Sequence, residues 1–198
     1  MIAVHTTRER SVADPRSLLP HEVEIFVVRE LRKAGLEPTA LKVRERNHAS
    51  KTDDYVVQLG CSLRIGGVYR EVLIECRNER APTTKIAVET LHAKLPEVKA
   101  QHAMLFSTAG FEPQAIRAGR TLGIPLLSVT DGKSAFARSP WGMAGDPPAW
   151  VPEYMAELVD LDATGQPRHD LLASGGSKQI LERLVGHPGH NEGSPQSR

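Results

Sequence analysis

One stretch of the sequence constrains the fold more than any other: two alternating runs of apolar and polar residues joined by a pair of glycines. In the first run, residues 55–65, every odd position is apolar, and the return run covers residues 68–77. Alternation with a period of two is the pattern of a strand with one face in a core. Gly66-Gly67 fits a two-residue hairpin turn. The sequence therefore predicts an antiparallel β-hairpin.

The position of the turn determines which residues of the hairpin face each other. With the turn centred on the two glycines, Gln58 faces Glu75 and Cys61 faces Val72. Apolar residues then pair with apolar ones and polar with polar. This agreement supports the register, because a slip of one residue would move every side chain to the other face of the sheet. The register also separates Cys61 from Cys76 by roughly 13 Å along the sheet, which is too far for a disulfide.

The sequence on either side of the hairpin predicts further helices and strands. Apolar residues at helical spacing, bounded by proline or glycine, indicate helices over about residues 20–34, 86–95 and 111–122. Residues 103–106 are an apolar run typical of a strand buried on both faces, and residues 124–129 read as another strand, so a right-handed parallel crossover is expected. We expect an α/β fold. Its central mixed sheet contains a β-hairpin and a parallel βαβ unit and is flanked by helices.

Composition divides the chain into four segments. Residues 1–16 are polar and unpatterned, which predicts a flexible lead-in before an α/β domain at residues 17–132. Proline and glycine are frequent after residue 132, so we expect residues 133–185 to form an irregular C-terminal extension with a possible short helix at 177–185. The composition of residues 186–198 is typical of a disordered tail.

The bulk properties exclude some classes of protein. The net charge is +1, so no overall basic excess indicates nucleic-acid binding, and any such surface has to be local. No apolar run approaches the roughly 20 residues of a membrane span, and the N-terminus lacks the apolar stretch of a signal peptide. We therefore expect a cytoplasmic protein that makes no membrane contact.

Three polar side chains of the hairpin form the most suggestive cluster. Glu75 and Arg77 share a face because they are two residues apart on a strand, and Gln58 lies opposite Glu75. A carboxylate beside a cation, next to a second acidic ligand, is the arrangement that metal-assisted phosphodiester cleavage needs. Carboxylates hold Mg²⁺, and the metal activates water and stabilises charge on the phosphate. Glu75, Arg77 and Gln58 are therefore candidate catalytic residues.

Two separate segments carry a resemblance to a known family. One is Ile74-Glu75-Cys76-Arg77, and the other is Leu105-Phe106-Ser107-Thr108-Ala109-Gly110-Phe111 with Ala115, Gly123-Ile124 and Leu126. They resemble the E-C-K or Q-C-K motif and the downstream strand–helix–strand signature of the restriction-endonuclease-like PD-(D/E)xK superfamily, in its Mrr-like branch. The resemblance covers roughly residues 20–130. It implies a restriction-endonuclease-like core and a Mg²⁺-dependent endonuclease acting on DNA, with Glu75 as metal ligand and Arg77 in the role of the family's lysine.

Two positions depart from the family's pattern. The family's first acidic ligand is an aspartate across from the first residue of the motif, where the register places Gln58. Arg77 replaces the lysine with a rigid planar fork instead of a compact ammonium group. Asp54 or Asp53 would supply the missing metal ligand only if the chain bends back, since Asp54 is roughly 13 Å from Gln58 on a regular strand. Glu24, on the first helix, matches a region where relatives carry an additional acidic residue.

Several interpretations of function remain open. Basic residues that would contact nucleic acid are Lys42, Arg44, Lys51 and Arg117, although a solvated edge strand also explains the first two. One interpretation is a Mg²⁺-dependent DNA endonuclease with a degenerate active site, and a homodimer is then possible because both strands have to be cut. The second is a catalytically inactive relative that binds nucleic acid or a protein partner. The third is a structural protein without nucleic-acid contacts.

Overall fold

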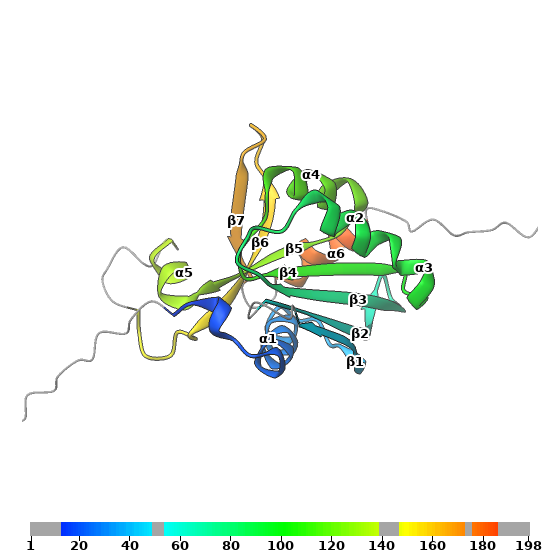
Figure 1. Ribbon diagram of the computed structural model, residues 1–198, viewed down its shortest axis with the longest axis horizontal. Coiled ribbons are helices and arrows are strands. Elements are labelled where there is room, and N and C mark those ends of the chain that lie inside the picture. Colours follow the sequence, from blue (N-terminus) through cyan, green and yellow to red (C-terminus); the bar gives the residue numbers. More distant parts are fainter. Residues whose placement is uncertain (1–12, 49–53, 139–146, 173–175, 186–198) are drawn as a thin grey trace, which may run out of the picture.

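The computed structural model describes residues 13–48, 54–138, 147–172 and 176–185, in which seven strands form one mixed sheet (Figure 1). The strands lie in the sheet in chain order: β1 (Thr39–His48), β2 (Tyr55–Ile65), β3 (Val68–Asn78), β4 (His102–Ser107), β5 (Leu126–Asp131), β6 (Tyr154–Leu161) and β7 (Pro167–Leu171). β4 is parallel to β3 and to β5, whereas the other neighbouring strands are antiparallel. This topology confirms the expected α/β fold with its mixed sheet, its hairpin and its parallel crossover.

Helices cover both faces of the sheet. They are the 3₁₀ turn η1 (Pro15–Ser17), α1 (Pro20–Lys33), α2 (Lys85–Ala93), α3 (Leu95–Val98), α4 (Pro113–Leu122), α5 (Gly132–Arg138) and α6 (Ser177–Val185). α1 and α6 share one hydrophobic core with the odd-numbered residues of β2, and α2 and α4 form a second core on the other face (Figure 1). Within the described ranges, no helix is long and apolar enough to cross a membrane.

The β2–β3 hairpin has the register predicted from the sequence. Gln58 pairs with Glu75, and the pairing continues without a shift along the whole hairpin. Gly66 and Gly67 form the turn with φ values of 59° and 86°. A two-residue turn of this kind needs positive φ at both positions, which glycine adopts without steric cost. Both cysteines are buried and free, as expected from their predicted separation.

The region after residue 132 differs from its prediction. Residues 154–161 and 167–171 form β6 and β7, a hairpin that continues the sheet beyond β5, so the expectation of an irregular extension is wrong there. The central residues of β6 are buried on both faces, and such a strand has no period-two pattern to read. α6 coincides with the short helix expected at 177–185. The N-terminal residues 1–12 and the predicted tail lie outside the described residues.

Candidate active site

The Glu75 carboxylate is the centre of the candidate site. Glu75 is 3% exposed and lies on the sheet face that α2 and α4 cover, since Leu73 two residues earlier belongs to their core. Its Oε2 accepts a hydrogen bond from the Gln58 amide nitrogen at 2.7 Å, and its Oε1 accepts one from Arg77 Nη1 at 2.9 Å. Lys94 Nζ lies 3.9 Å from Oε2. Both carboxylate oxygens therefore face donors that the chain itself supplies.

Arg77 links two carboxylates. Its Nε and Nη2 donate to the Glu79 carboxylate at 3.0 and 2.6 Å, while its Nη1 donates to Glu75. Burial on its own would lower the pKa of Arg77, but the hydrogen bonds and charges of Glu79 and Glu75 raise this pKa above its ordinary value. A permanently charged guanidinium group therefore lies between two acids, as a bound cation would in a two-carboxylate site.

Lys94 and Glu79 complete the cluster, although the sequence pattern does not single them out. Glu79 follows β3, and its spacing of two residues from Arg77 was the one available signal. Lys94 is the C-cap residue of α2. The start of α2 lies near the end of β4, where the Thr83 hydroxyl donates to the Ser107 hydroxyl at 2.9 Å. The helix thus returns along the sheet, and only this packing brings Lys94 back to Glu75.

An irregularity in β1 brings Arg44 to the same face of the sheet. The pairing with β2 shifts between Val43 and Glu45, which makes Arg44 the extra residue of a β-bulge. The Arg44 side chain lies over Gly60, because a Cβ atom added at Gly60 would be 2.5 Å from Arg44 Nε. Gly60 is two residues from Gln58 on β2, so the two positions share a face. The Arg44 guanidinium therefore lies beside the candidate site.

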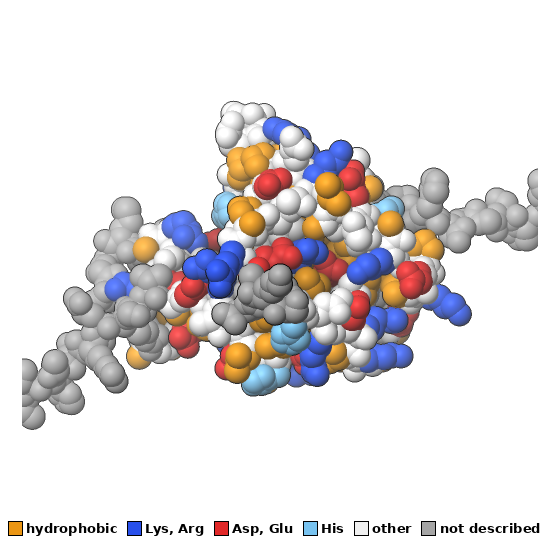
Figure 2. Space-filling view, viewed as in Figure 1, with side chains coloured by type: hydrophobic (Ala, Val, Ile, Leu, Met, Phe, Trp, Pro, Cys, Tyr) orange, Lys and Arg blue, Asp and Glu red, His pale blue; other side chains and the backbone are white. Residues whose placement is uncertain are grey.

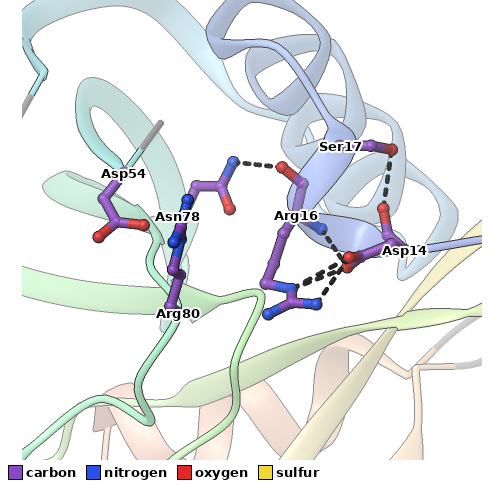
Figure 3. Close-up of a pocket in the computed structure, with 6 residues that line it drawn as sticks. All are labelled: Asp14, Arg16, Ser17, Asp54, Asn78 and Arg80. Atoms are coloured by element: carbon purple, nitrogen blue, oxygen red, sulfur yellow. Dashed lines mark hydrogen bonds and ion pairs between the residues drawn. The ribbon is translucent and has the colours of Figure 1, made fainter. Parts of the chain in front are cut away.

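Asp54 contributes to a different part of the surface. It lines a pocket of about 370 Å³ together with Asp14, Arg16, Ser17, Asn78 and Arg80. Figure 3 shows Asp54 beside Asn78 and Arg80, with the Arg16–Asp14 ion pair on the far side of the pocket. That ion pair lowers the pKa of Asp14. Asp54 is not among the groups that contact Glu75, and Asp53 lies outside the described residues.

The remaining predicted site residues do not join the Glu75 cluster. Glu24, on α1, accepts hydrogen bonds from Arg46 at 2.6 and 2.9 Å. Arg117, on α4, lines a groove with residues of α2. Lys42 is exposed on β1, and Lys51 lies outside the described residues. Of the predicted residues, the structure therefore brings together Glu75, Arg77 and Gln58, with Arg44 beside them.

These side chains do not fit the magnesium site that the sequence motif implies. Mg²⁺ prefers several oxygen ligands, carboxylates above all. Glu75 and Glu79 are both engaged by Arg77, and Gln58 directs its amide nitrogen toward Glu75. In the part of the chain that the structure describes, no three His, Cys, Asp or Glu side chains are grouped so that they could hold a metal ion.

Charge is distributed without a dominant sign. Figure 2 shows acidic and basic side chains interspersed over the visible face, in keeping with the net charge of +1. A protein that binds nucleic acid through a broad basic surface has an excess of lysine and arginine on one face. The face shown in Figure 2 therefore presents no broad basic surface.

Comparison with known proteins places the fold in a family. The family model described as "Restriction endonuclease" matches residues 15–133, more than half of the chain. The solved structure of EndoMS in its apo form is similar over 55% of this chain and 45% of that chain, with 18% sequence identity and a TM-score of 0.34. The chain thus spans less than half the length of that structure. No curated protein matches. On the strength of the family model, the chain belongs to the restriction endonuclease family and has a DNA-endonuclease fold.

Proposed function

We propose that this protein binds DNA through its endonuclease fold and does not hydrolyse it by a metal-dependent route. The observation that carries the proposal is the position of Arg77. Its guanidinium donates three hydrogen bonds to Glu75 and Glu79, the two carboxylates that would otherwise be free to hold a metal. The family generally uses a divalent metal, so the proposal separates this chain from its relatives in activity but not in fold.

The chemistry of the three Arg77 nitrogen donors supports this proposal. An arginine keeps its charge at every accessible pH and presents its N–H groups in a fixed fork, so it cannot withdraw by losing a proton. A hydrogen bond to a charged group contributes about 1.5–3 kcal/mol, and a metal ion would have to displace several of them. Gln58 stands where the family has an acid, and a neutral amide does not compensate for a lost carboxylate. A metal ion would therefore have to break the hydrogen bonds of Arg77 and would find one carboxylate ligand fewer than in the family.

Two observations support DNA as the partner. The family model covers β1 to β5, including the strand that carries Glu75, and its members are endonucleases by description. The cluster also contains the cations Arg44 and Lys94 on that face, and backbone phosphates are bound by such groups. The net charge of +1 makes a sequence-independent electrostatic contribution from the rest of the surface small.

The test combines a binding assay and a cleavage assay on purified full-length protein. Duplex DNA is expected to bind in the presence of EDTA, with an affinity that falls as salt rises and that Mg²⁺ does not increase. Supercoiled plasmid is expected to stay intact with Mg²⁺ or Mn²⁺. Absence of salt-dependent DNA binding would contradict the proposal outright.

The second candidate function is a metal-dependent DNA endonuclease with a degenerate site. The match of the restriction endonuclease model over residues 15–133 favours it. Its signature is plasmid nicking or cutting that requires Mg²⁺ or Mn²⁺ and that Glu75→Ala abolishes. Arg46→Gln, which changes an arginine bonded to Glu24 on α1, serves as the control that keeps such activity. Cleavage that Glu75→Ala does not change indicates a contaminating nuclease.

A further inference from the structure

We infer that Arg44 and Lys94 form a metal-independent binding site for a DNA backbone phosphate, and that the bulge in β1 and Gly60 in β2 position Arg44 for it. The inference rests on the proposed function, because it assigns the phosphate contact of the same DNA. It differs from a nuclease site in that two side-chain cations, and no metal ion, neutralise the phosphate. Four features of the described residues carry it.

The first feature is the register shift in β1. Val43 and Glu45 pair with the adjacent residues Leu59 and Gln58, so Arg44 between them has no partner on β2; a second shift lies between Thr39 and Lys42. β-Bulges occur next to functional sites because they redirect a side chain. β1 is the edge strand, and all ten of its residues are exposed, so no core packing requires this irregularity. The bulge accompanies a placement of the Arg44 side chain over Gly60.

The second feature is a glycine inside a strand. Gly60 lies in the middle of β2, where glycine weakens a strand and often marks the close approach of another group. The group that approaches is Arg44: its Nε would be 2.5 Å from a Cβ atom at position 60, and its Cζ and Nη2 would be 3.3 Å from it. Any other residue at this position would push the guanidinium away from the sheet. Gly60 thus makes room for Arg44 on the face of Gln58 and Glu75.

The third feature is the second cation, Lys94. It approaches Glu75 from the end of α2, while Arg44 approaches Gly60 from β1, so two elements far apart in the sequence place cations on the same face of the sheet. Gly60 pairs with Leu73, the neighbour of Glu75 on the same face of β3, so both cations lie over adjacent positions of the sheet. Lys94 keeps 34% of its side chain exposed, and its Nζ is 3.9 Å from Glu75, which is a loose contact.

The fourth feature is the state of the acids on this face. Arg77 forms ion pairs with both Glu75 and Glu79, and Lys94 supplies a second positive charge near Glu75. Glu45 accepts a hydrogen bond from the Asn47 amide at 2.7 Å, and Glu71 accepts one from Ser62. Within the described part of the chain, Arg44 forms no ion pair. Arg44, which forms no ion pair among the described residues, and Lys94, whose contact with Glu75 is loose, are therefore the cations of the cluster with donors left for an incoming anion.

The experiment measures the affinity of a short fluorescein-labelled DNA duplex by fluorescence anisotropy, in EDTA and over a series of salt concentrations. Arg44→Gln and Lys94→Gln are each expected to weaken binding about fivefold at physiological salt and to lower the slope of log K against log salt by about 1. Gly60→Ala keeps every charge but displaces Arg44, so it is expected to weaken binding about twofold or more. Arg44→Lys keeps a positive charge at position 44, so it should weaken DNA binding less than Arg44→Gln does.

Arg46→Gln is the matched control. It removes the same charge from the same strand, but Arg46 is bonded to Glu24 of α1, on the opposite face, so its affinity should stay within about twofold of the wild type. Thermal unfolding of each variant confirms that it is folded. Unchanged affinity in Arg44→Gln or Lys94→Gln, with normal binding by the wild type, overturns the phosphate site and leaves the proposed function standing. Equal weakening by Arg46→Gln also overturns the phosphate site and leaves the proposed function standing. Absence of DNA binding by the wild type overturns both the phosphate site and the proposed function.

Discussion

Arg77 occupies the position in which the related motif has a lysine, and its contacts show how much chemistry depends on that one side chain. A lysine ammonium group is a point charge that can turn toward a water molecule or a phosphate. The Arg77 guanidinium instead donates to Glu75 with one nitrogen and to Glu79 with two. Because each nitrogen has a partner, the group is fixed as part of the site's structure. At the scale of single residues, the cluster is a pair of carboxylates bridged by one guanidinium, with the Lys94 ammonium beside Glu75.

Removal of Arg77 tests that description. Arg77→Ala is expected to lower the free energy of unfolding by about 3 kcal/mol, since Glu75 is 3% exposed and would lose its closest cation. Urea denaturation at neutral pH measures the loss. The double variant Glu75→Gln/Arg77→Ala should lose less than Arg77→Ala alone, because no buried charge is left without its partner. A double variant that is less stable than the single one would contradict the role assigned to Arg77.

At the scale of elements, the β6–β7 hairpin is joined to the N-terminal helix by a buried charge. Glu30, on α1, is 0% exposed, and its Oε2 accepts the backbone N–H of Ala156 on β6 at 3.0 Å. Its carboxylate also pairs with Lys33 at 2.5 Å and with Arg29 at 3.3 Å. The C-terminal hairpin is thus part of the same folded unit as α1, since they share a buried carboxylate.

Glu30→Ala measures that link. The variant leaves the Ala156 N–H without its acceptor, so the free energy of unfolding is expected to fall by about 2 kcal/mol. Hydrogen exchange at the amides of β6 should accelerate more than exchange at those of β2. Glu37→Ala, at an exposed position after the same helix, is the control and should change stability by less than about 0.5 kcal/mol. Equal effects of the two substitutions would argue against the link.

A second buried acid predicts how the hairpin responds to pH. Burial raises the pKa of Glu157, but the hydrogen bonds and charges of His169 and Arg138 outweigh it and hold this pKa below the ordinary value of 4.5. Because the pKa of Glu157 is lowered by folding, its carboxylate stabilises the folded protein at pH values above 4.5. This contribution to the free energy of unfolding is lost as the pH falls through the lowered pKa. The stability difference between wild type and Glu157→Gln should therefore shrink between about pH 4.5 and pH 3. A difference that does not change over this range would contradict the assignment.

The elements also show which parts of the fold can be predicted from the sequence. The β2–β3 hairpin was predictable to the residue, because its alternation and its glycine turn lie within one continuous stretch. β6 carried no such signal, since a strand buried on both faces loses the alternation. At the site, Glu75, Gln58 and Arg77 followed from the hairpin register. Lys94 did not, because its approach depends on how α2 packs on the sheet, which no local pattern encodes.

At the scale of the whole molecule, the sheet is continuous beyond the region that the family model covers. That match ends at residue 133, whereas β6 and β7 extend the sheet and α6 covers its first core with Ile180 and Leu184. The boundary of the folded unit therefore lies beyond residue 132, and the expected domain at 17–132 is too short. A homodimer stays a prediction, which the oligomeric state in solution will decide.

Truncation tests this boundary. A fragment that ends at residue 138 exposes the edge of β5 and the apolar side chains that β6 and α6 bury, among them Leu127 and Val129. We expect this fragment to show no cooperative thermal transition by circular dichroism, whereas a fragment of residues 13–185 should unfold cooperatively. A cooperative transition in the shorter fragment would show that the endonuclease-like core folds without its C-terminal hairpin.

The central claim is that Arg77, and not a metal ion, bridges the carboxylates of Glu75 and Glu79. Isothermal titration calorimetry of the full-length protein with Mn²⁺ or Mg²⁺ tests it most directly, with Glu75→Gln as the comparison. The expected result is no binding that distinguishes the wild type from Glu75→Gln. Stoichiometric metal binding by the wild type that Glu75→Gln abolishes would contradict the claim.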